Sequence, residues 1–510
     1  MALKPLIQKT AASVASIPAP VGGWNARDSL ANMAPTDAVT LENFFPSVSN
    51  VVLRGGYTQY ATGLGSQVET LMAYSSGTAS KLFAAAGTKI YDASSSGAVG
   101  AAVVSALSNA RWQYSNITTA GGSFLMAVNG ADAALLYDGT TWSNPSISGV
   151  TDSTLDNITL FKHRLWFHQK NTLKAWYLPT DSIGGTAQEF DLSSIARLGG
   201  KLVAIGTWTV DAGYGSDDNL VFVTSKGEVI IYRGTDPANA STWSLIGVWT
   251  LGAPVGNRCL IKYGGDLLLL TLNGLFPLGQ TLQSDRVDPT VALSDKIQGA
   301  ISSATAIYKD TFGWQVVFSP LNNAVFVNVP FSVGTQQQFV MNTITRAWCN
   351  FTGWAANCWE IYNDNPYFGG NGFVGKAFDT GYVDNATNIA TNALQAFNYY
   401  GSRGVKKYFT RARPSIFTNG TPSISMGMNT DFNTANVSAP LSFSQTVYGV
   451  WDVGLWDTAI WGAGLDITNN WQGITGLGYC GAINLQSASQ GVQIEWASTD
   501  VVYQKGWGGI

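Results

Sequence analysis

The chain has 510 residues, a length that predicts two or three domains or one large repeat fold. Charged residues make up 12% of the sequence, about half of the usual share, and the formal net charge is −4. A generally basic nucleic-acid-binding protein is therefore excluded, because such a protein neutralises phosphates with an excess of lysine and arginine. A surface with so few charges also predicts that other subunits cover much of it.

Hydrophobic residues make up 45% of the chain, which excludes a protein that stays disordered. No apolar run is long enough for a transmembrane helix, and lysines at both ends of the apolar start argue against a signal peptide. We therefore expect no membrane insertion. The cysteines show no C-x-x-C spacing, so we expect reduced, buried thiols at Cys259, Cys349, Cys358 and Cys480.

Residues 1–62 are punctuated by proline and glycine, and we expect them to form an extended N-terminal arm. Helical periodicity is scarce along the whole chain. Cap-type residues flank three short segments, and we expect helices there, at 36–43, 193–198 and 294–300. Most of the remaining sequence consists of short apolar or β-branched runs separated by Gly, Asn, Asp or Ser, which predicts an all-β chain.

The runs recur as hairpins with one pattern: a hydrophobic strand, a turn with Gly or Asn, and a second strand that often ends in an aromatic residue. Seven such hairpins lie at 81–92, 124–139, 164–179, 219–234, 267–280, 315–330 and 366–381. Their starts are 40 to 55 residues apart, an interval typical of four-stranded propeller blades. We therefore predict a β-propeller of six or seven blades over residues 63–385.

Residues 386–510 lie outside this pattern and predict a separate C-terminal β domain, for which the arm is the segment available to complete a sheet. This region holds a triplet of tryptophans, Trp451, Trp456 and Trp461, spaced by five residues. That spacing fits neither a strand nor a helix, so it indicates short turns that are each anchored by an indole. The indoles are expected either in the core or as anchors of a subunit interface.

The only concentrated basic cluster is Lys406, Lys407, Arg411 and Arg413. On a regular strand, Lys407, Arg411 and Arg413 would share one face. Two interpretations stay open for that face: a solvated strand surface, or a surface that meets phosphate or the acidic groups of a neighbour.

Catalytic and ligand-binding motifs are weak. The chain has two histidines, His163 and His168, which would point to opposite faces of one strand and could not share a metal, so we expect both to serve packing. The segment from Leu136 to Trp142 resembles a sialidase Asp-box, but a tight turn at Asp138 with Trp142 packed behind it also explains these residues. We expect no catalytic residues, no metal and no cofactor.

Several segments carry a family resemblance: residues 22–28 (GGWNARD), 37–38 (DA), 42–46 (ENFFP), 53–57 (LRGGY), 293–297 (LSDKI), 336–351 (QQQFVMNTITRAWCNF) and the tryptophan triplet. Together they are spread over most of the chain. They resemble the tail nozzle, or tail tubular, proteins of short-tailed bacteriophages.

The resemblance implies a structural virion protein without enzymatic activity. Such a subunit forms a homohexameric ring that extends the DNA channel below the portal and adaptor rings, closes it, and opens it for genome ejection. The expected location is the virion tail, assembled in the host bacterial cytoplasm. Expected partners are further copies of the chain, the adaptor ring, other tail proteins and viral double-stranded DNA in weak contact, since a negatively charged ring repels phosphates.

For docking to these partners the candidate interface residues are Trp24, Arg27, Asp28, Lys407, Arg411, Arg413, Trp451, Trp456 and Trp461. The candidate gating loops are the long stretches at 180–218 and 281–314. The alternative functions are a receptor-binding or polysaccharide-degrading tail protein on a propeller scaffold, and a cellular scaffold propeller.

Overall fold

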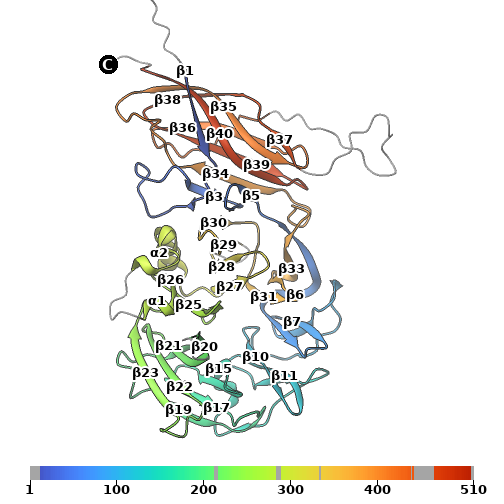
Figure 1. Cartoon of the computed structure of the whole chain (residues 1–510). Coiled ribbons are helices and arrows are strands. Elements are labelled where there is room, and N and C mark those ends of the chain that lie inside the picture. The colour runs from blue at the N-terminus through green and yellow to red at the C-terminus, as the bar shows by residue number, and fades with distance from the viewer. Residues whose placement is uncertain are drawn as a thin grey trace, which may run out of the picture. The chain divides into compact units, whose positions relative to one another are not determined.

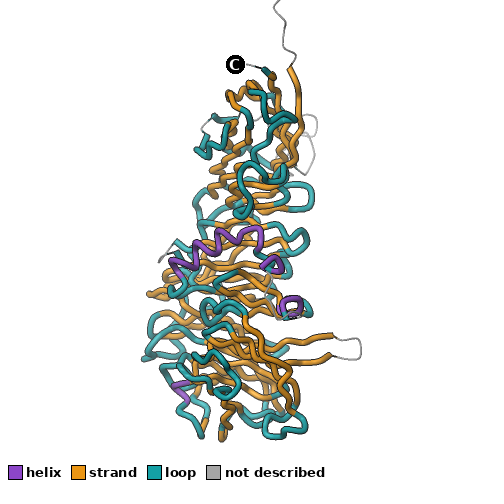
Figure 2. Tube along the Cα trace, turned by 90° about the vertical axis from the view of Figure 1, so that its left-hand side faces the viewer, coloured by secondary structure: helices purple, strands orange, loops and turns teal. Residues whose placement is uncertain are grey.

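The computed structural model describes residues 12–211, 216–282, 289–331, 335–437, 439–441 and 465–506. The chain forms two units. The propeller unit holds residues 57–339 and 352–378, and the terminal unit holds residues 1–56, 340–351 and 379–510. Strands dominate both units (Figure 1, Figure 2), and no helix in the described ranges is long and apolar enough to span a membrane.

Seven consecutive antiparallel sheets, the blades, make up the propeller unit. The first four blades contain β6 (Gly56–Ser75), β7 (Ser80–Ala86) and β8 (Lys89–Asp92); β10 (Gln113–Thr119), β11 (Gly122–Val128), β12 (Leu135–Tyr137) and β13 (Trp142–Ser143); β15 (Leu155–Phe161), β16 (Arg164–Gln169), β17 (Lys174–Tyr177) and β19 (Gln188–Asp191); β20 (Leu202–Asp211), β21 (Ser216–Thr224), β22 (Glu228–Gly234) and β23 (Trp243–Thr250). The last three contain β24 (Leu260–Tyr263), β25 (Asp266–Thr271) and β26 (Gly274–Pro277); β27 (Gln315–Ser319), β28 (Ala324–Val329) and β29 (Gln337–Asn342); β31 (Cys358–Tyr362), β32 (Asn365–Gly369) and β33 (Asn371–Asp379).

The circle of blades is closed by the long strand β6. Its second half pairs with β7 in the first blade, while β6 also pairs with β33 of the last blade. Three two-residue strands lie between the main blade strands: β9 (Gly97–Ala98) pairs with β6, and β14 (Ile147–Ser148) pairs in parallel with β18 (Gly185–Thr186). Because the circle is closed, few strand edges are left unpaired. The predicted β-propeller is confirmed, and the described residues form seven blades.

Alternation of side chains explains why the blades stack face to face. In the first blade Leu71, Leu82 and Ala84 pack towards the last blade, whereas Met72 and Phe83 pack towards the second. Because successive side chains of a strand point to opposite faces, both faces of each blade are buried. The central strands therefore read as nearly continuous apolar runs, which is the pattern seen in the sequence.

The terminal unit is built from both ends of the chain as two sheets. One contains β1 (Ala12–Pro18), β4 (Phe44–Pro46), β5 (Val51–Leu53), β35 (Lys407–Thr418), β37 (Asp466–Thr468), β38 (Gln472–Gly478) and β40 (Ile494–Lys505). The other contains β2 (Gly23–Trp24), β3 (Asp37–Glu42), β30 (Trp348–Phe351), β34 (Ile389–Gln395), β36 (Ile424–Thr430) and β39 (Gly481–Ser489). Phe409 of β35 packs closely over Gly481 of β39, where an added Cβ would lie 2.8 Å from the ring.

The N-terminal arm is part of this unit. β1 pairs with β40 over its whole length, β5 pairs with β40 beside it, and β3 pairs with β34. The boundaries expected after residues 62 and 385 lie a few residues from the observed ones after 56 and 378, while the inclusion of 340–351 in the terminal unit was not expected.

Two of the three expected helices are wrong. Residues 36–43 contain strand β3, because pairing with β34 outweighs the weak local preference, and 193–198 form turns. The third expectation is partly correct. The short helix η3 (Asp295–Ile297) continues as α2 (Gln298–Tyr308), which runs beyond residue 300. The other helical segments are η1 (Asp152–Thr154), α1 (Leu278–Thr281) and η2 (Pro289–Val291).

Candidate functional site

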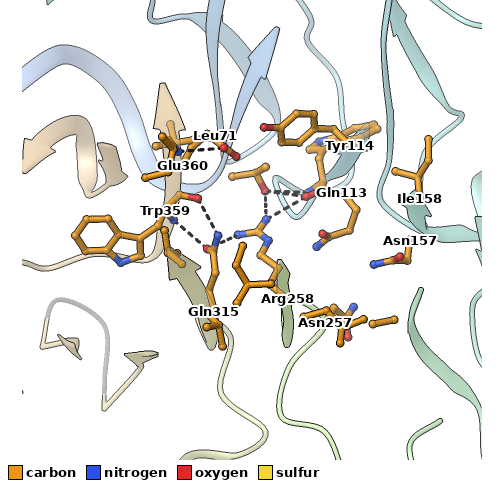
Figure 3. A pocket seen from close by; sticks show the side chains of 18 of the residues that line it. Leu71, Gln113, Tyr114, Asn157, Ile158, Asn257, Arg258, Gln315, Trp359 and Glu360 are labelled. Atoms are coloured by element: carbon orange, nitrogen blue, oxygen red, sulfur yellow. Dashed lines mark hydrogen bonds between the residues drawn. The ribbon is translucent and has the colours of Figure 1, made fainter. Parts of the chain in front are cut away.

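The innermost strands of the seven blades surround a central cavity of about 340 Å³. Each of these strands, β6, β10, β15, β20, β24, β27 and β31, contributes residues to its wall. Polar side chains in the wall include Gln113, Asn157, Arg258, Gln315 and Glu360. Figure 3 shows that they come from different blades and converge on one space. Polar groups that converge on one cavity are a usual signature of a binding or catalytic site.

Arg258, two residues before the start of β24, connects the fifth blade to others across this cavity. Its Nη2 donates to Thr70 Oγ1 at 2.6 Å and to the Trp112 carbonyl at 3.0 Å. Its Nη1 donates to the Glu69 carbonyl at 3.1 Å and to Gln315 Oε1 at 3.5 Å (Figure 3). The guanidinium thus holds the first, second, fifth and sixth blades together, and these four bonds use its terminal donors.

Glu360 of β31 and Tyr114 of β10 form the titratable part of the cavity. Burial raises the pKa of Glu360 to about 7, against the opposing effects of hydrogen bonds from Tyr114 and the Ile361 backbone and of the Arg258 charge. Burial, with the Glu360 charge, also raises the pKa of Tyr114 well above its usual value. Glu360 can therefore gain or lose a proton near neutral pH, while the Tyr114 phenol stays protonated and donates to it.

The arrangement is better suited to holding blades than to holding a substrate. A substrate carboxylate or phosphate would need free guanidinium donors, and those of Arg258 already bind protein acceptors. No group of His, Cys, Asp and Glu within the described ranges is arranged to hold a metal ion. The chemistry of the cavity is therefore a buried hydrogen-bond network around one titratable carboxyl group.

The two histidines lie in different environments. His168 is buried on β16, where its Nε2 lies 3.1 Å from the Val203 carbonyl, and burial lowers its pKa. His163 lies in the turn before β16 with φ of +58° and contacts Asp181 at 3.0 Å on the surface. The expectation that both lie on one strand is wrong for His163, because Lys162 and His163 form the turn between β15 and β16. Both make packing or surface contacts, as expected.

The Asp-box-like segment is a structural turn. Asp138 Oδ1 accepts from the backbone N–H groups of Thr140 and Thr141 at 2.8 and 2.7 Å, and Gly139 has φ of +97°. The Trp142 ring packs on Phe83 with ring centroids 5.0 Å apart. The predicted tight turn with Trp142 behind it is confirmed, and it joins β12 to β13.

The arm residues Trp24, Arg27 and Asp28 lie in the terminal unit, on β2 and in the loop that follows it. Trp24 is half-buried on β2, and Arg27 Nε donates to Asp28 Oδ1 at 2.8 Å on the surface. Asn25 Nδ2 donates to Asp28 and to buried Asp37, at 2.9 and 2.7 Å. Asp28 therefore holds the loop after β2, and Arg27 is the more exposed of the pair.

The basic cluster departs from the expected pattern. A β-bulge between Phe409 and Arg411 shifts the alternation of β35, so Lys407 lies on the inner face while Arg411 and Arg413 lie on the outer face. The prediction that Lys407 shares a face with the two arginines is wrong for this reason. Lys407 is fully buried and donates to the carbonyls of Ser402 and Tyr479, and burial lowers its pKa.

The tryptophan triplet, Trp451, Trp456 and Trp461, lies outside the described residues. The four cysteines are buried and unpaired, as expected, and burial raises the pKa of the Cys259 and Cys358 thiols to about 12.

Arg258, Tyr114 and Glu360 were missed by the sequence analysis. They lie in or beside first strands of blades, whereas the hairpin pattern located the second and third strands in most blades. For Glu360 the sequence carries one signal, an isolated charge within the apolar strand CWEIY, and this signal does not extend to Arg258 or Tyr114.

No family model and no curated protein sequence matches the chain. Solved structures to which it is similar include the β-propeller domain of Myceliophteria thermophila Cps50 (Swd1), with 14% identity, TM-score 0.40, and coverage of 61% of this chain and 96% of that one. Another is Saccharomyces cerevisiae Sqt1, with 12% identity, TM-score 0.39, and coverage of 67% and 96%. A third is BBS1N in complex with ARL6DN, with 10% identity, TM-score 0.39, and coverage of 64% and 96%. The chain is an all-β protein with a β-propeller.

Proposed function

We propose that the chain is a structural subunit of a ring, the tail nozzle of a short-tailed bacteriophage. In this proposal identical copies surround the DNA channel below the adaptor ring, and the ring closes the channel until the genome is ejected. The proposal rests on the family resemblance of the sequence and on what the residues of that resemblance do in the fold.

The observation that carries the proposal is that most of the described residues of the resemblance lie in the terminal unit, namely 22–28, 37–38, 42–46, 53–56 and 340–351, while 293–297 lie in the propeller unit. Gly23 has φ of +82°, and a Cβ there would lie 2.6 Å from the Trp348 carbonyl oxygen. Arg54 is fully buried and makes a bidentate ion pair with Asp384, at 2.9 and 2.5 Å, while its Nε donates to Asn43. Matches of this kind support a shared architecture, because each residue type is required by local geometry.

The propeller unit supplies a rigid body and a candidate channel loop. Hairpin β20–β21, which lies at the end of the candidate gating stretch 180–218, extends away from the other strands in Figure 2. The other stretch, 281–314, contains helix α2, whose Thr305 Oγ1 donates to the Leu272 carbonyl at 3.3 Å. We therefore favour the β20–β21 hairpin as the element that enters the channel.

The alternative of a polysaccharide-degrading or receptor-binding tail protein would place its ligand in the central cavity. The Arg258 bonds already occupy the groups that would bind an acidic sugar there. The observations support the structural role over this alternative.

The test is electron microscopy of the purified chain and of virions. The expected result is a closed ring of six copies with a central opening, and specific antibody bound at the tail of the particle. A chain that stays monomeric or dimeric at every concentration and is absent from particles would refute the proposal.

A further inference from the structure

The outer face of the sheet that contains β35 and β40 is an open surface with an ordered pattern. Strand register places Leu477, Tyr408, Gln504 and Ala12 in one row across β38, β35, β40 and β1. The next row contains Gly473, Arg411, Val502 and Val14. Directly paired residues of neighbouring strands share a face, so these side chains form one continuous surface.

This outer face carries positive charge without enough acidic partners. Arg411 is exposed and makes no hydrogen bond or ion pair with a described residue. Lys406, exposed just before β35, lies over the Tyr479 ring at 5.6 Å, and Arg413 pairs with Asp500 at 2.6 Å. The acidic residues of β40 are already bonded, since Asp500 accepts from Arg413 and Glu495 accepts from Asn50. Lys406 and Arg411 are therefore cations without an acidic partner among the described residues.

Large apolar side chains lie beside these cations. Val14 is 63% exposed, Leu477 46% and Trp471 41%. The Trp471 ring lies 4.9 Å from the Arg413 guanidinium carbon. Exposed aliphatic and aromatic groups beside arginine are typical of the centre of a protein interface. A DNA backbone would satisfy the cations but would leave the apolar groups in contact with water.

The complementary chemistry occurs in the chain itself, at residues 442–464. This segment contains Asp452 and Asp457, three tryptophans and no Lys or Arg. Acidic groups that each follow an indole match a face on which cations stand beside apolar groups. Two other segments of the terminal unit lie outside the described residues: 1–11 contains Lys4 and Lys9 and no acid, so the face repels it, and 507–510 contains no acidic side chain.

We propose that the outer face formed by Lys406, Arg411, Trp471 and Leu477 receives the acidic, tryptophan-containing segment 442–464 of a neighbouring copy of the chain. The choice of a neighbouring copy rests on the proposed ring, in which every subunit gives one surface and receives another. Such a contact joins unlike surfaces and closes when the rotation between copies closes. The indoles supply buried apolar area, and the two aspartates set the position of the segment against the cations.

The experiment uses two charge-reversed variants of the full chain. K406E/R411E reverses the face, and D452K/D457K reverses the segment. Each variant alone is expected to lose association about tenfold or more by sedimentation velocity, because like charges then meet at the contact. An equimolar mixture of the two is expected to associate again, since each reversed face then meets a reversed segment.

The matched control is K89E/K226E, which reverses two exposed lysines of the propeller unit and changes the net charge equally. It is expected to associate like the wild type, and circular dichroism melting checks that all variants fold. If each segment bound the face of its own chain, mixing the two variants would not restore association. Restored association therefore supports a contact between copies, and a mixture that stays dissociated overturns the inference.

Other outcomes are equally decisive. Rings formed as well by both reversed variants would overturn this contact while leaving the proposed nozzle function intact. A control that loses association as much as K406E/R411E would show a general charge effect and would overturn the contact too. A wild-type chain that never associates would overturn the nozzle function and this contact together.

Discussion

Arg54 shows at the scale of one residue how the terminal unit is held together. Its guanidinium is fully buried and binds Asp384, Asn43 and the Gly55 carbonyl. Asn43 Nδ2 in turn donates to the Ala390 carbonyl at 2.7 Å. A residue of the N-terminal arm thereby fixes a segment more than three hundred residues away in sequence.

Substitution of Arg54 tests this role. Arg54→Met is expected to lower the free energy of unfolding of the terminal unit by about 3–5 kcal/mol, because Asp384 is left as an unpaired buried charge. Urea unfolding followed by circular dichroism measures the change. The control is Arg27→Met, which removes an exposed ion pair and is expected to lower stability by about 1 kcal/mol or less. Equal effects of the two substitutions would contradict the assignment.

The raised pKa of Glu360 predicts that the stability of the fold depends on pH. The pKa of Glu360 is raised by burial from 4.5 to about 7, so between these values the folded chain binds a proton that the unfolded chain has lost. The associated stability is fully present below pH 4.5 and is lost as pH rises through 7. The shift corresponds to about 3 kcal/mol.

Glu360→Gln removes the titration while it keeps the acceptor for the Ile361 N–H. The variant is therefore expected to be more stable than the wild type above pH 7, by up to about 3 kcal/mol, and to lose that advantage as pH falls towards 4.5. Thermal melting across this range measures the difference. A difference between the two proteins that does not change with pH would count against it.

At the scale of elements, patterns of neighbouring residues predicted the hairpins but not the strands and bulges that depend on distant partners. All seven hairpins were predicted correctly, because alternation and turn residues are local properties. Residues 36–43 were predicted as a helix but form β3, since its partners β34 and β30 lie hundreds of residues away. The bulge in β35 has the same origin: no residue in KKYFTRAR announces it, and pairing with β40 creates it.

Helix α2 offers an element with a buried and an exposed face. Ile301, Ala304 and Thr305 are buried at helical spacing, whereas Ile307 is 71% exposed. Ile301→Ala is expected to destabilise the propeller unit by about 2–5 kcal/mol, because a cavity remains in the core. Ile307→Ala should change stability by only about 0.5 kcal/mol. Chemical denaturation of both variants checks the contrast, and similar losses would disprove this orientation of the helix.

At the scale of the whole molecule, the two ends of the chain matter in different ways. Residues 1–11 precede β1, while β1 itself completes the edge of β40 and buries Ile17. A chain without residues 1–11 is therefore expected to melt like the full chain. A chain without residues 1–24 loses β1 and β2, and its terminal unit should melt roughly 5–10 °C lower, since each kcal/mol shifts Tm by about 2–4 °C at this size.

Calorimetry of the two truncated chains measures the difference. If both melted at the temperature of the full chain, β1 would be dispensable for the fold. If the shorter truncation already lowered Tm, residues 1–11 would have a structural role of their own.

The sequence by itself determined the all-β class, the repeated hairpins and the propeller, because turn chemistry and two-residue alternation act between neighbours in the chain. Only the tertiary structure decided that β6 closes the circle, that Arg258 and Glu360 meet in the central cavity, and that Lys407 is buried while Arg411 is exposed. These outcomes depend on contacts between residues far apart in the chain. Such contacts are selected by packing of the whole fold, and no local pattern encodes them.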